Sequence, residues 1–413
     1  MIHTPWAVLL CKFGNNDFEP FPRKYYEDLF TTTGVGSMNM VDYFHDVSHG
    51  ALDLSGTKVF PRNNGWYTPI NQAASDYNSI LATARNAAMA DGVNLAEYFS
   101  VLVCTNWQLD TQGAPGGVVA DAMGTFPAVL GHEMGHAYGL SHSGADGSTA
   151  EYGDPWDIMS AKLTYMADHP EWRSDPRAQV NNGEETVGPI LNACNMAAMS
   201  WLDETRVWTA NNGVIALRPL IRRDLPGFLA ARLGSYLVEF RVKEGWDARV
   251  EPVVLVHRFE ASRSYLMSDT DGRQGLIKGS VFQVGDSTAP LSDWIYVKVL
   301  DIDASGYSAT LELVHRLAAS APVLGPGALL GGVTADGGGW IILGKRVIHV
   351  PPRSPAMPLL EEVAAIQGSD LITNPATRDM VRREALSAIA GHVEMQRSSL
   401  SPLPAHSNSH PKD

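Results

Sequence analysis

The chain has 413 residues, of which 45% are hydrophobic and 18% are charged. Its length predicts two or three domains, and its composition excludes a mostly disordered or fibrous protein. The formal net charge of −14 provides no positive field for nucleic acid or an anionic membrane surface, so neither partner is expected. No apolar run approaches the roughly 18 residues of a membrane-spanning helix.

The cysteines and the N-terminal residues bear on where the protein works. Cys11, Cys104 and Cys194 are too few and too widely spaced for a disulfide framework, and we expect buried free thiols. Met1–Trp6 carries no basic segment, which predicts that this sequence has no secretory signal. Together these features predict a soluble protein that is either cytosolic or in a processed form.

The first half of the chain alternates strand and helix patterns, which predicts a sheet covered by long helices. Thr68 followed by Pro69 predicts the start of a long amphipathic helix that ends at Gly92. In chain order the expected elements are a strand ending at residue 11, a helix over 37–47, a short strand at 51–54, that long helix, a buried strand at 98–104, a Gly-rich loop over 111–124 and a helix from about Thr125.

Beyond Trp208 short apolar stretches with period-two alternation predict a β-sandwich over residues 209–316. The expected strands are 214–217, 236–242, 253–258, 281–284, 295–300 and 309–314. Residues 317–413 are predicted to hold a Gly-, Pro- and Ala-rich linker to Gly339, helices at 358–367 and 374–393, and a disordered tail over 398–413.

The most informative stretch is His132–His142, which reads HEMGHAYGLSH. His132 and His136 are four residues apart, so on a helix their imidazoles lie on one face and can reach a single ion. Gly139 can adopt the left-handed conformation that ends a helix, which lets the chain bring His142 back as a third ligand. Three neutral imidazoles suit Zn²⁺ with one coordination position left for water.

Glu133 adjoins the first of these histidines. It is placed to accept a proton from a metal-bound water and to pass that proton to a departing amine. We therefore expect Glu133 to act as the general base of a hydrolase.

Met159 follows seventeen residues after His142, in the sequence Asp157-Ile-Met-Ser160. With HExxHxxGxxH, a turn of this kind resembles the Met-turn of the metzincin zinc metalloproteases. Phe44–Leu54 and Leu191–Leu202 are similar to blocks of the immune inhibitor A and gametolysin-like peptidases within that group.

The resemblance implies an α+β fold with a metzincin-type peptidase domain at 1–208, a mixed twisted sheet with long helices. It implies one catalytic Zn²⁺ on His132, His136 and His142, with Glu133 as base and Met159 in the Met-turn. It further implies protein or peptide substrates and an extracellular protein. A non-catalytic binding protein with a structural zinc site and an interacting β-sandwich is the alternative.

Calcium is a second metal to weigh. Asp301–Glu312 matches an EF-hand loop in its letters, but alternating strands flank it, so a β-hairpin turn is favoured. Asp154 and Asp157 either bind a structural Ca²⁺ or cap turns, the second being favoured.

Two other segments near the motif carry hypotheses. Tyr165 either polarises a substrate carbonyl or is a packed aromatic, and the packed aromatic is favoured. Ala114–Asp121 is expected to supply an edge strand that pairs with extended substrate, so that Val119→Pro would impair cleavage.

Overall fold

The computed structural model describes residues 1–70, 76–122, 124–160, 164–172, 185–285 and 294–316, with the backbone of three later strands at 329–333, 339–343 and 346–350. Residues 1–283 and 295–315 form one compact unit, and residues 284–294 and 316–413 form another. The first unit is a mixed α+β structure with several sheets and few helices.

The N-terminal sheet has the order β4-β2-β6-β8-β7, with β5 also paired to β2. All its neighbours are parallel except β7, which runs antiparallel to β8 at the edge. Its strands are β2 (Trp6–Phe13), β4 (Lys58–Phe60), β5 (Tyr67–Ile70), β6 (Ser100–Thr105), β7 (Gln112–Ala114) and β8 (Gly117–Ala120). All of β6 and nearly all of β2 is buried, as expected for parallel strands covered on both faces.

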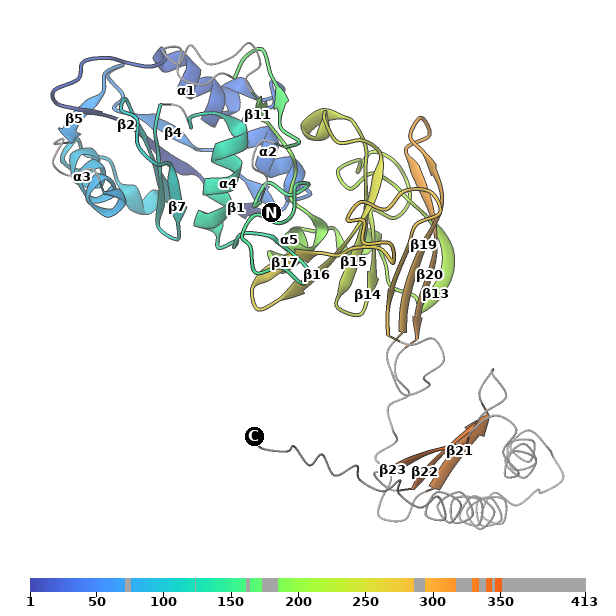
Figure 1. The fold of residues 1–413 in the computed structure, drawn as a ribbon. Coiled ribbons are helices and arrows are strands. Elements are labelled where there is room, and N and C mark those ends of the chain that lie inside the picture. The colour runs from blue at the N-terminus through green and yellow to red at the C-terminus, as the bar shows by residue number, and fades with distance from the viewer. Residues whose placement is uncertain are drawn as a thin grey trace, which may run out of the picture. The chain divides into compact units, whose positions relative to one another are not determined.

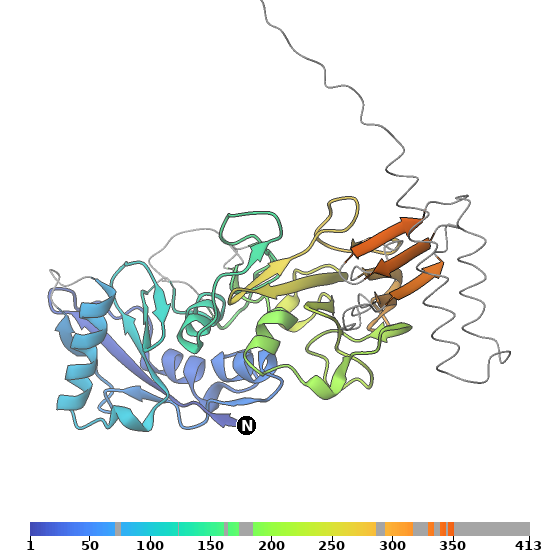
Figure 2. The same ribbon diagram turned by 90° about the horizontal axis from the view of Figure 1, so that it is seen from below.

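Helices cover both faces of this sheet (Figures 1 and 2). Trp6, Val8 and Leu10 of β2 share a core with α1 (Arg23–Phe30), α2 (Met40–Val47) and α4 (Pro127–Tyr138). The alternate β2 residues pack instead with α3 (Tyr77–Ala90). Alternate side chains of β2 therefore point to opposite faces of the sheet and belong to two separate hydrophobic cores.

Three expected boundaries in this region are wrong. The helix predicted from residue 37 begins at Met40, because Asn39 caps it in a reciprocal arrangement with Asp42. Thr68 and Pro69 lie in β5, paired with β2, and α3 begins at Tyr77 behind the capping side chain of Asp76. The Gly-rich stretch 111–124 holds β7 and β8 rather than only a loop.

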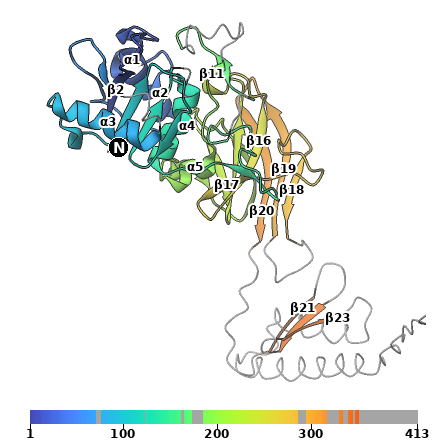
Figure 3. The same ribbon diagram turned by 60° about the vertical axis from the view of Figure 1, so that its left-hand side comes forward.

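The β-rich region forms two sheets, in the orders β12-β14-β15-β16-β17-β9 and β13-β20-β19-β18 (Figure 3). Every strand expected after Trp208 is present. The bounds are β9 (Gly144–Ala145), β12 (Val207–Trp208), β13 (Asn212–Leu217), β14 (Ala230–Leu233), β15 (Tyr236–Arg241), β16 (Val253–Glu260), β17 (Arg263–Leu266), β18 (Val281–Val284), β19 (Trp294–Asp303) and β20 (Ser308–Arg316).

The hairpin of β19 and β20 decides one alternative, because its turn holds the acidic stretch that resembles an EF-hand in its letters. Asp303 accepts hydrogen bonds from the N–H of Gly306 and the hydroxyl of Ser305. These bonds close a turn between two strands, so the hairpin prediction is confirmed.

One strand joins the N-terminal part of the first unit to the β-rich region. β9 pairs in parallel with β17, Gly144 opposite Tyr265 and Ala145 opposite Leu266. The short helix α5 (Ala193–Ala198) contacts β15, β16 and β17 (Figure 3). The segment that follows His142 is thus anchored on strands more than one hundred residues later in the chain.

The remaining short elements complete the fold. They are β1 (Ile2–His3) paired with β3 (Leu52–Asp53), β10 (Ala167–Asp168) paired with β11 (Glu185–Val187), and single 3₁₀ turns at Thr32–Gly34, Leu95–Glu97, Glu204–Arg206 and Gly245–Asp247. The three cysteines are buried free thiols, as predicted. No helix within the described residues is long and apolar enough to cross a membrane.

The second unit contains an antiparallel sheet of β21 (Leu329–Val333), β22 (Gly339–Leu343) and β23 (Arg346–Val350). β21 lies inside the stretch expected to be a linker, so that expectation is wrong for 329–333. The helices predicted at 358–367 and 374–393 and the predicted tail over 398–413 lie outside the described residues.

Candidate metal centre

The helix α4 and the turn after it bring three histidines together. α4 begins with Pro127 at its first position, and Gly139 ends it with φ 109°. The N–H of Gly139 bonds to the carbonyl of His136, and the N–H of Leu140 bonds to that of Gly135. This left-handed termination satisfies two terminal carbonyls and reverses the chain, as the glycine predicted.

The reversal places His142 beside His136. The Nε2 atom of His136 lies 3.1 Å from Nε2 of His132 and 3.0 Å from Nε2 of His142. In the part of the chain that the structure describes, these histidines form the one group of three or more candidate ligands close enough to hold a metal ion.

Hydrogen bonds at the opposite ring atoms fix how these imidazoles are protonated. Nδ1 of His132 lies 2.8 Å from the carbonyl oxygen of Ile158, and Nδ1 of His136 lies 2.8 Å from that of Leu140. Because a carbonyl only accepts, Nδ1 carries the proton in both rings. Nδ1 of His142 faces the Glu151 carboxylate at 3.5 Å, which favours the same tautomer.

The arrangement fits a metal ion. With protons on Nδ1, the neutral rings turn Nε2 lone pairs toward one another at 3.0–3.1 Å, an arrangement that is repulsive without a cation between them. Two nitrogen ligands about 2.0–2.1 Å from a tetrahedral Zn²⁺ stand about 3.3 Å apart, close to what is observed. His132, His136 and His142 therefore suit Zn²⁺ in number, type and spacing.

Burial keeps these rings neutral. It lowers the pKa of His132 to about 4, against the opposing bond to Ile158. Burial likewise lowers the pKa of His136 and of His142, the latter with help from neighbouring positive charge. Neutral imidazole is the form that binds metal.

Met159 lies directly beneath the metal-binding helix and is fully buried. A Cβ on Gly135 would meet its sulfur at 2.5 Å, so the two residues fit only because position 135 has no side chain. The adjacent Ile158 supplies the carbonyl that orients His132. Met159 and Ile158 thus contact α4 at Gly135 and at His132.

Glu133 lies on the β7 side of α4, half-buried. A Cβ on Gly113 would collide with the Glu133 carbonyl, so the backbone of β7 is in close contact with α4. Burial raises the pKa of Glu133 to about 8, opposed by a hydrogen bond from the Gly113 backbone. A divalent ion on the histidines would act in the opposite direction and favour the carboxylate.

Tyr152 is a residue that the sequence analysis missed. Its ring centroid lies 4.2 Å from that of His142 and 6.1 Å from that of His132. Burial, then the charges of Glu151 and Glu133, raises its pKa, which keeps the phenol protonated. Its backbone has φ 60°, an uncommon value away from glycine that turns the chain toward the histidines.

Tyr165 is not part of this cluster. Its ring stacks on Trp156 with centroids 5.3 Å apart, beside the buried valines Val250 and Val253. The packed-aromatic interpretation is therefore confirmed.

Asp154 and Asp157 lie in a buried polar network rather than in a metal group. Asp154 accepts from the N–H of Trp156 and pairs with His257 Nε2 at 2.9 Å, and Asp157 accepts from the backbone and side chain of Asn192. Both carboxylates are fully buried. Hydrogen bonding of turns, the favoured alternative, accounts for them.

The expected edge strand is displaced along the chain. β8 holds Val119, and it lies between β6 and β7. The edge is β7, so Val119→Pro would disrupt an internal ladder and would not test substrate pairing.

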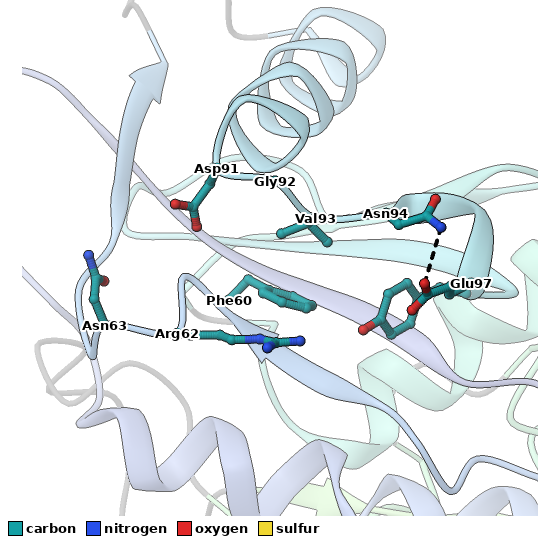
Figure 4. Close-up of a pocket in the computed structure, with 9 residues that line it drawn as sticks. Phe60, Arg62, Asn63, Asp91, Gly92, Val93, Asn94 and Glu97 are labelled. Atoms are coloured by element: carbon teal, nitrogen blue, oxygen red, sulfur yellow. Dashed lines mark hydrogen bonds between the residues drawn. The ribbon is translucent and has the colours of Figure 1, made fainter.

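A pocket adjoins the histidines, and a second pocket lies elsewhere in the described residues. One of about 300 Å³ is lined by His136, Leu140, Ser141, His142, Glu151 and Arg263. The other, of about 350 Å³, is lined by nine residues between the end of β4, the end of α3 and the turn at Leu95–Glu97 (Figure 4). There Arg62 extends along Phe60, and Asn94 donates to Glu97 at 3.1 Å. It shares no residue with the histidine pocket, so it is separate from the metal centre.

Comparisons with known proteins add little. The chain matches no protein-family model and no curated protein. Two crystal structures of wild-type OgpA from Akkermansia muciniphila are similar at 12% identity. Each match covers 76% of this chain, and 92% or 93% of that one, with TM-scores of 0.27 and 0.29. Structural similarity at these TM-scores does not support a functional assignment. The chemistry of the site is therefore inferred from its own geometry.

Proposed function

We propose that the protein is a zinc-dependent endopeptidase of metzincin type that cleaves protein or peptide substrates. The observation that carries this proposal is the convergence of three Nε2 atoms with every Nδ1 facing an acceptor, next to a carboxylate on the same helix. The Met159 turn beneath α4 supports the metzincin assignment.

The number of ligands favours catalysis over a structural role. A structural zinc site is closed by four protein ligands, whereas a catalytic one keeps a position for water or substrate. Within the described ranges the group contains three residues, His132, His136 and His142. The alternative, a binding protein with a structural zinc, would need a fourth ligand that this group does not contain.

The chemistry divides between the ion and the chain. Bound zinc would lower the pKa of a water molecule toward ~7 and polarise the scissile carbonyl. Glu133 takes the proton of the attacking water and returns it to the departing amine nitrogen. Tyr152, protonated and in contact with His142, donates a hydrogen bond to the carbonyl oxygen as negative charge develops there.

The edge strand β7 offers a way to bind extended peptides. Among the described strands it pairs with β8 alone, and it packs against α4. An extended substrate adding to its open side would run past Glu133 and be held by main-chain hydrogen bonds, which discriminate little among side chains.

The test is hydrolysis of a quenched-fluorescence peptide library by the zinc-loaded protein, with and without a chelator. We expect cleavage that the chelator abolishes and zinc restores. Glu133→Ala should keep one zinc per chain and lose a factor of about 10²–10⁴ in kcat. Glu97→Ala, a change in the separate pocket, is the matched control and should cleave normally. Undiminished turnover by Glu133→Ala would refute the assigned base.

A further inference from the structure

The pocket beside the metal centre is built from two distant parts of the chain. Five of its six lining residues lie between His136 and Glu151, and the sixth, Arg263, begins β17. The turn between β16 and β17 places it there, with Ala261 at φ 49° and Ser262 at φ 69°. Two successive left-handed residues form the tight turn that suits the twist of a hairpin.

The Arg263 side chain is held in place from two sides. Its guanidinium carbon lies 5.6 Å from the ring centroid of Tyr265, which pairs with Gly144 across the sheet. A Cβ on Gly144 would meet Nε of Arg263 at 3.3 Å and Cζ at 3.4 Å. The guanidinium therefore rests against the bare backbone two residues beyond His142.

Among the described residues this guanidinium has no anionic partner. No carboxylate of a described residue lies within 4.0 Å of it, and its Nε is buried without a hydrogen-bond acceptor. One long bond of 3.4 Å joins it to the carbonyl of Ala150. The neighbouring Arg258, by contrast, is 3.0 Å from Asp146 and 3.0 Å from Glu260.

The pocket also holds one carboxylate, that of Glu151. It faces Nδ1 of His142 at 3.5 Å and so is engaged by an imidazole N–H. Of the two charged side chains that line this pocket, Glu151 is thus engaged by the His142 ring, whereas Arg263 has no carboxylate of a described residue within 4.0 Å.

We propose that Arg263 is a specificity-determining residue that binds a carboxylate of the substrate beside the scissile bond. The inference rests on the proposed peptidase function and names the substrate class for it. A planar guanidinium donates two parallel hydrogen bonds to a carboxylate, which is why arginine serves where such groups are recognised. The carboxylate belongs either to an aspartate or glutamate side chain or to the C-terminus of a peptide.

The experiment compares matched peptides after mass spectrometry has located the bonds that the zinc-loaded protein cleaves in casein. One set moves a single Glu, or Gln in its place, through the four positions on each side of the bond. A second set compares free-acid and amidated C-termini. At one position the wild-type protein should prefer the carboxylate by about tenfold to a hundredfold in kcat/KM, mainly through KM.

Variants assign that preference to the residue. Arg263→Gln should cleave the Glu and Gln peptides equally, and Arg263→Glu should favour a Lys peptide at the same position. Arg258→Gln is the matched control, since Arg258 lies in the same hairpin but is already paired, and it should keep the preference. Zinc content and thermal midpoint, measured for each variant, report whether the fold is intact.

The outcomes separate the two proposals. Cleavage with no carboxylate preference, or a preference that survives in Arg263→Gln, overturns the role of Arg263 and leaves the peptidase assignment standing. Absence of any zinc-dependent cleavage overturns the peptidase assignment and the substrate class with it.

Discussion

Nδ1 of His132 donates a hydrogen bond to the carbonyl of Ile158 at 2.8 Å, so the segment that carries Met159 sets the tautomer of the first candidate ligand. Outer partners of this kind orient ligating histidines and raise their basicity. The turn is itself held by fully buried carboxylates on either side of Trp156, which tie it to α5 and to β16. Buried hydrogen bonds therefore connect the candidate metal centre to the β-rich region.

The first prediction concerns the metal. The pure protein should contain one zinc per chain by elemental analysis, and His142→Ala should lose it while His45→Ala, a change at an exposed histidine, should not. Zinc at 100 times its Kd should stabilise the wild-type fold by about 2.7 kcal/mol, visible as a fall in thermal midpoint on adding chelator. Equal zinc content in all three proteins would contradict the ligand set.

The second prediction concerns the tyrosine that contacts His142. Tyr152→Phe removes a hydroxyl and leaves the ring, so we expect kcat to fall by about 10²-fold with little change in KM. Tyr165→Phe removes the same atom from a ring packed on Trp156 and should leave both constants unchanged. If the two variants behave alike, Tyr152 does not act on the reacting carbonyl.

The third prediction concerns the buried pair of Asp154 and His257. Burial lowers the pKa of His257, but the carboxylates of Asp154 and Glu239 outweigh it and raise the pKa overall, which favours the protonated ring. His257→Leu would leave Asp154 buried and uncompensated, at a cost of about 3–5 kcal/mol in the free energy of unfolding.

Urea denaturation measures that loss. Arg258→Leu, one residue along the same strand and partly exposed, is the comparison and should cost about 1 kcal/mol or less. A similar loss in the two variants would mean that the buried pair contributes no more than a surface pair.

The fourth prediction concerns pH and a histidine away from the metal centre. His49 is 6% exposed, its Nε2 donates to the carbonyl of Leu220, and its Nδ1 accepts from the N–H of Asp203. Burial is the main reason that its pKa falls to about 4 from an ordinary 6.5. Both ring atoms are thus committed to the neutral form.

Because the pKa of His49 is lower in the folded protein, the free energy of unfolding falls as the pH falls. The unfolded chain binds the proton first, so the stability that neutral His49 provides is complete above pH 6.5 and disappears as the pH falls toward 4, by about 3 kcal/mol in all. In chelator, the free energy of unfolding of His49→Gln should fall less steeply over this range than that of the wild type. His3→Gln, at an exposed site, should keep the wild-type slope.

Much of the metal centre follows from sequence because it is local. An i, i+4 pair on a helix and a glycine that can adopt positive φ fix two ligands and bring the third to them, and the structure places His132, His136 and His142 accordingly. The roles of Glu133 and Met159 remain proposals.

The elements that the sequence did not predict depend on distant partners. Thr68 and Pro69 have the letters of a helix start, yet pairing with β2 decides their conformation. Tyr152 reaches the histidines through an unusual backbone angle, and Arg263 arrives through a strand pairing far along the chain. Periodicity and spacing describe neighbours in sequence, so they do not predict such contacts.

The parallel pairing of β9 with β17 has a practical consequence for anyone dissecting this protein. A fragment ending at residue 208 would keep every histidine of the HExxHxxGxxH segment but would lose the strand that Gly144 and Ala145 hydrogen-bond to. It would also expose the apolar side of α5 to water and leave Asp154 without its His257 partner. The shortest fragment worth expressing therefore runs to the end of β20, at Arg316.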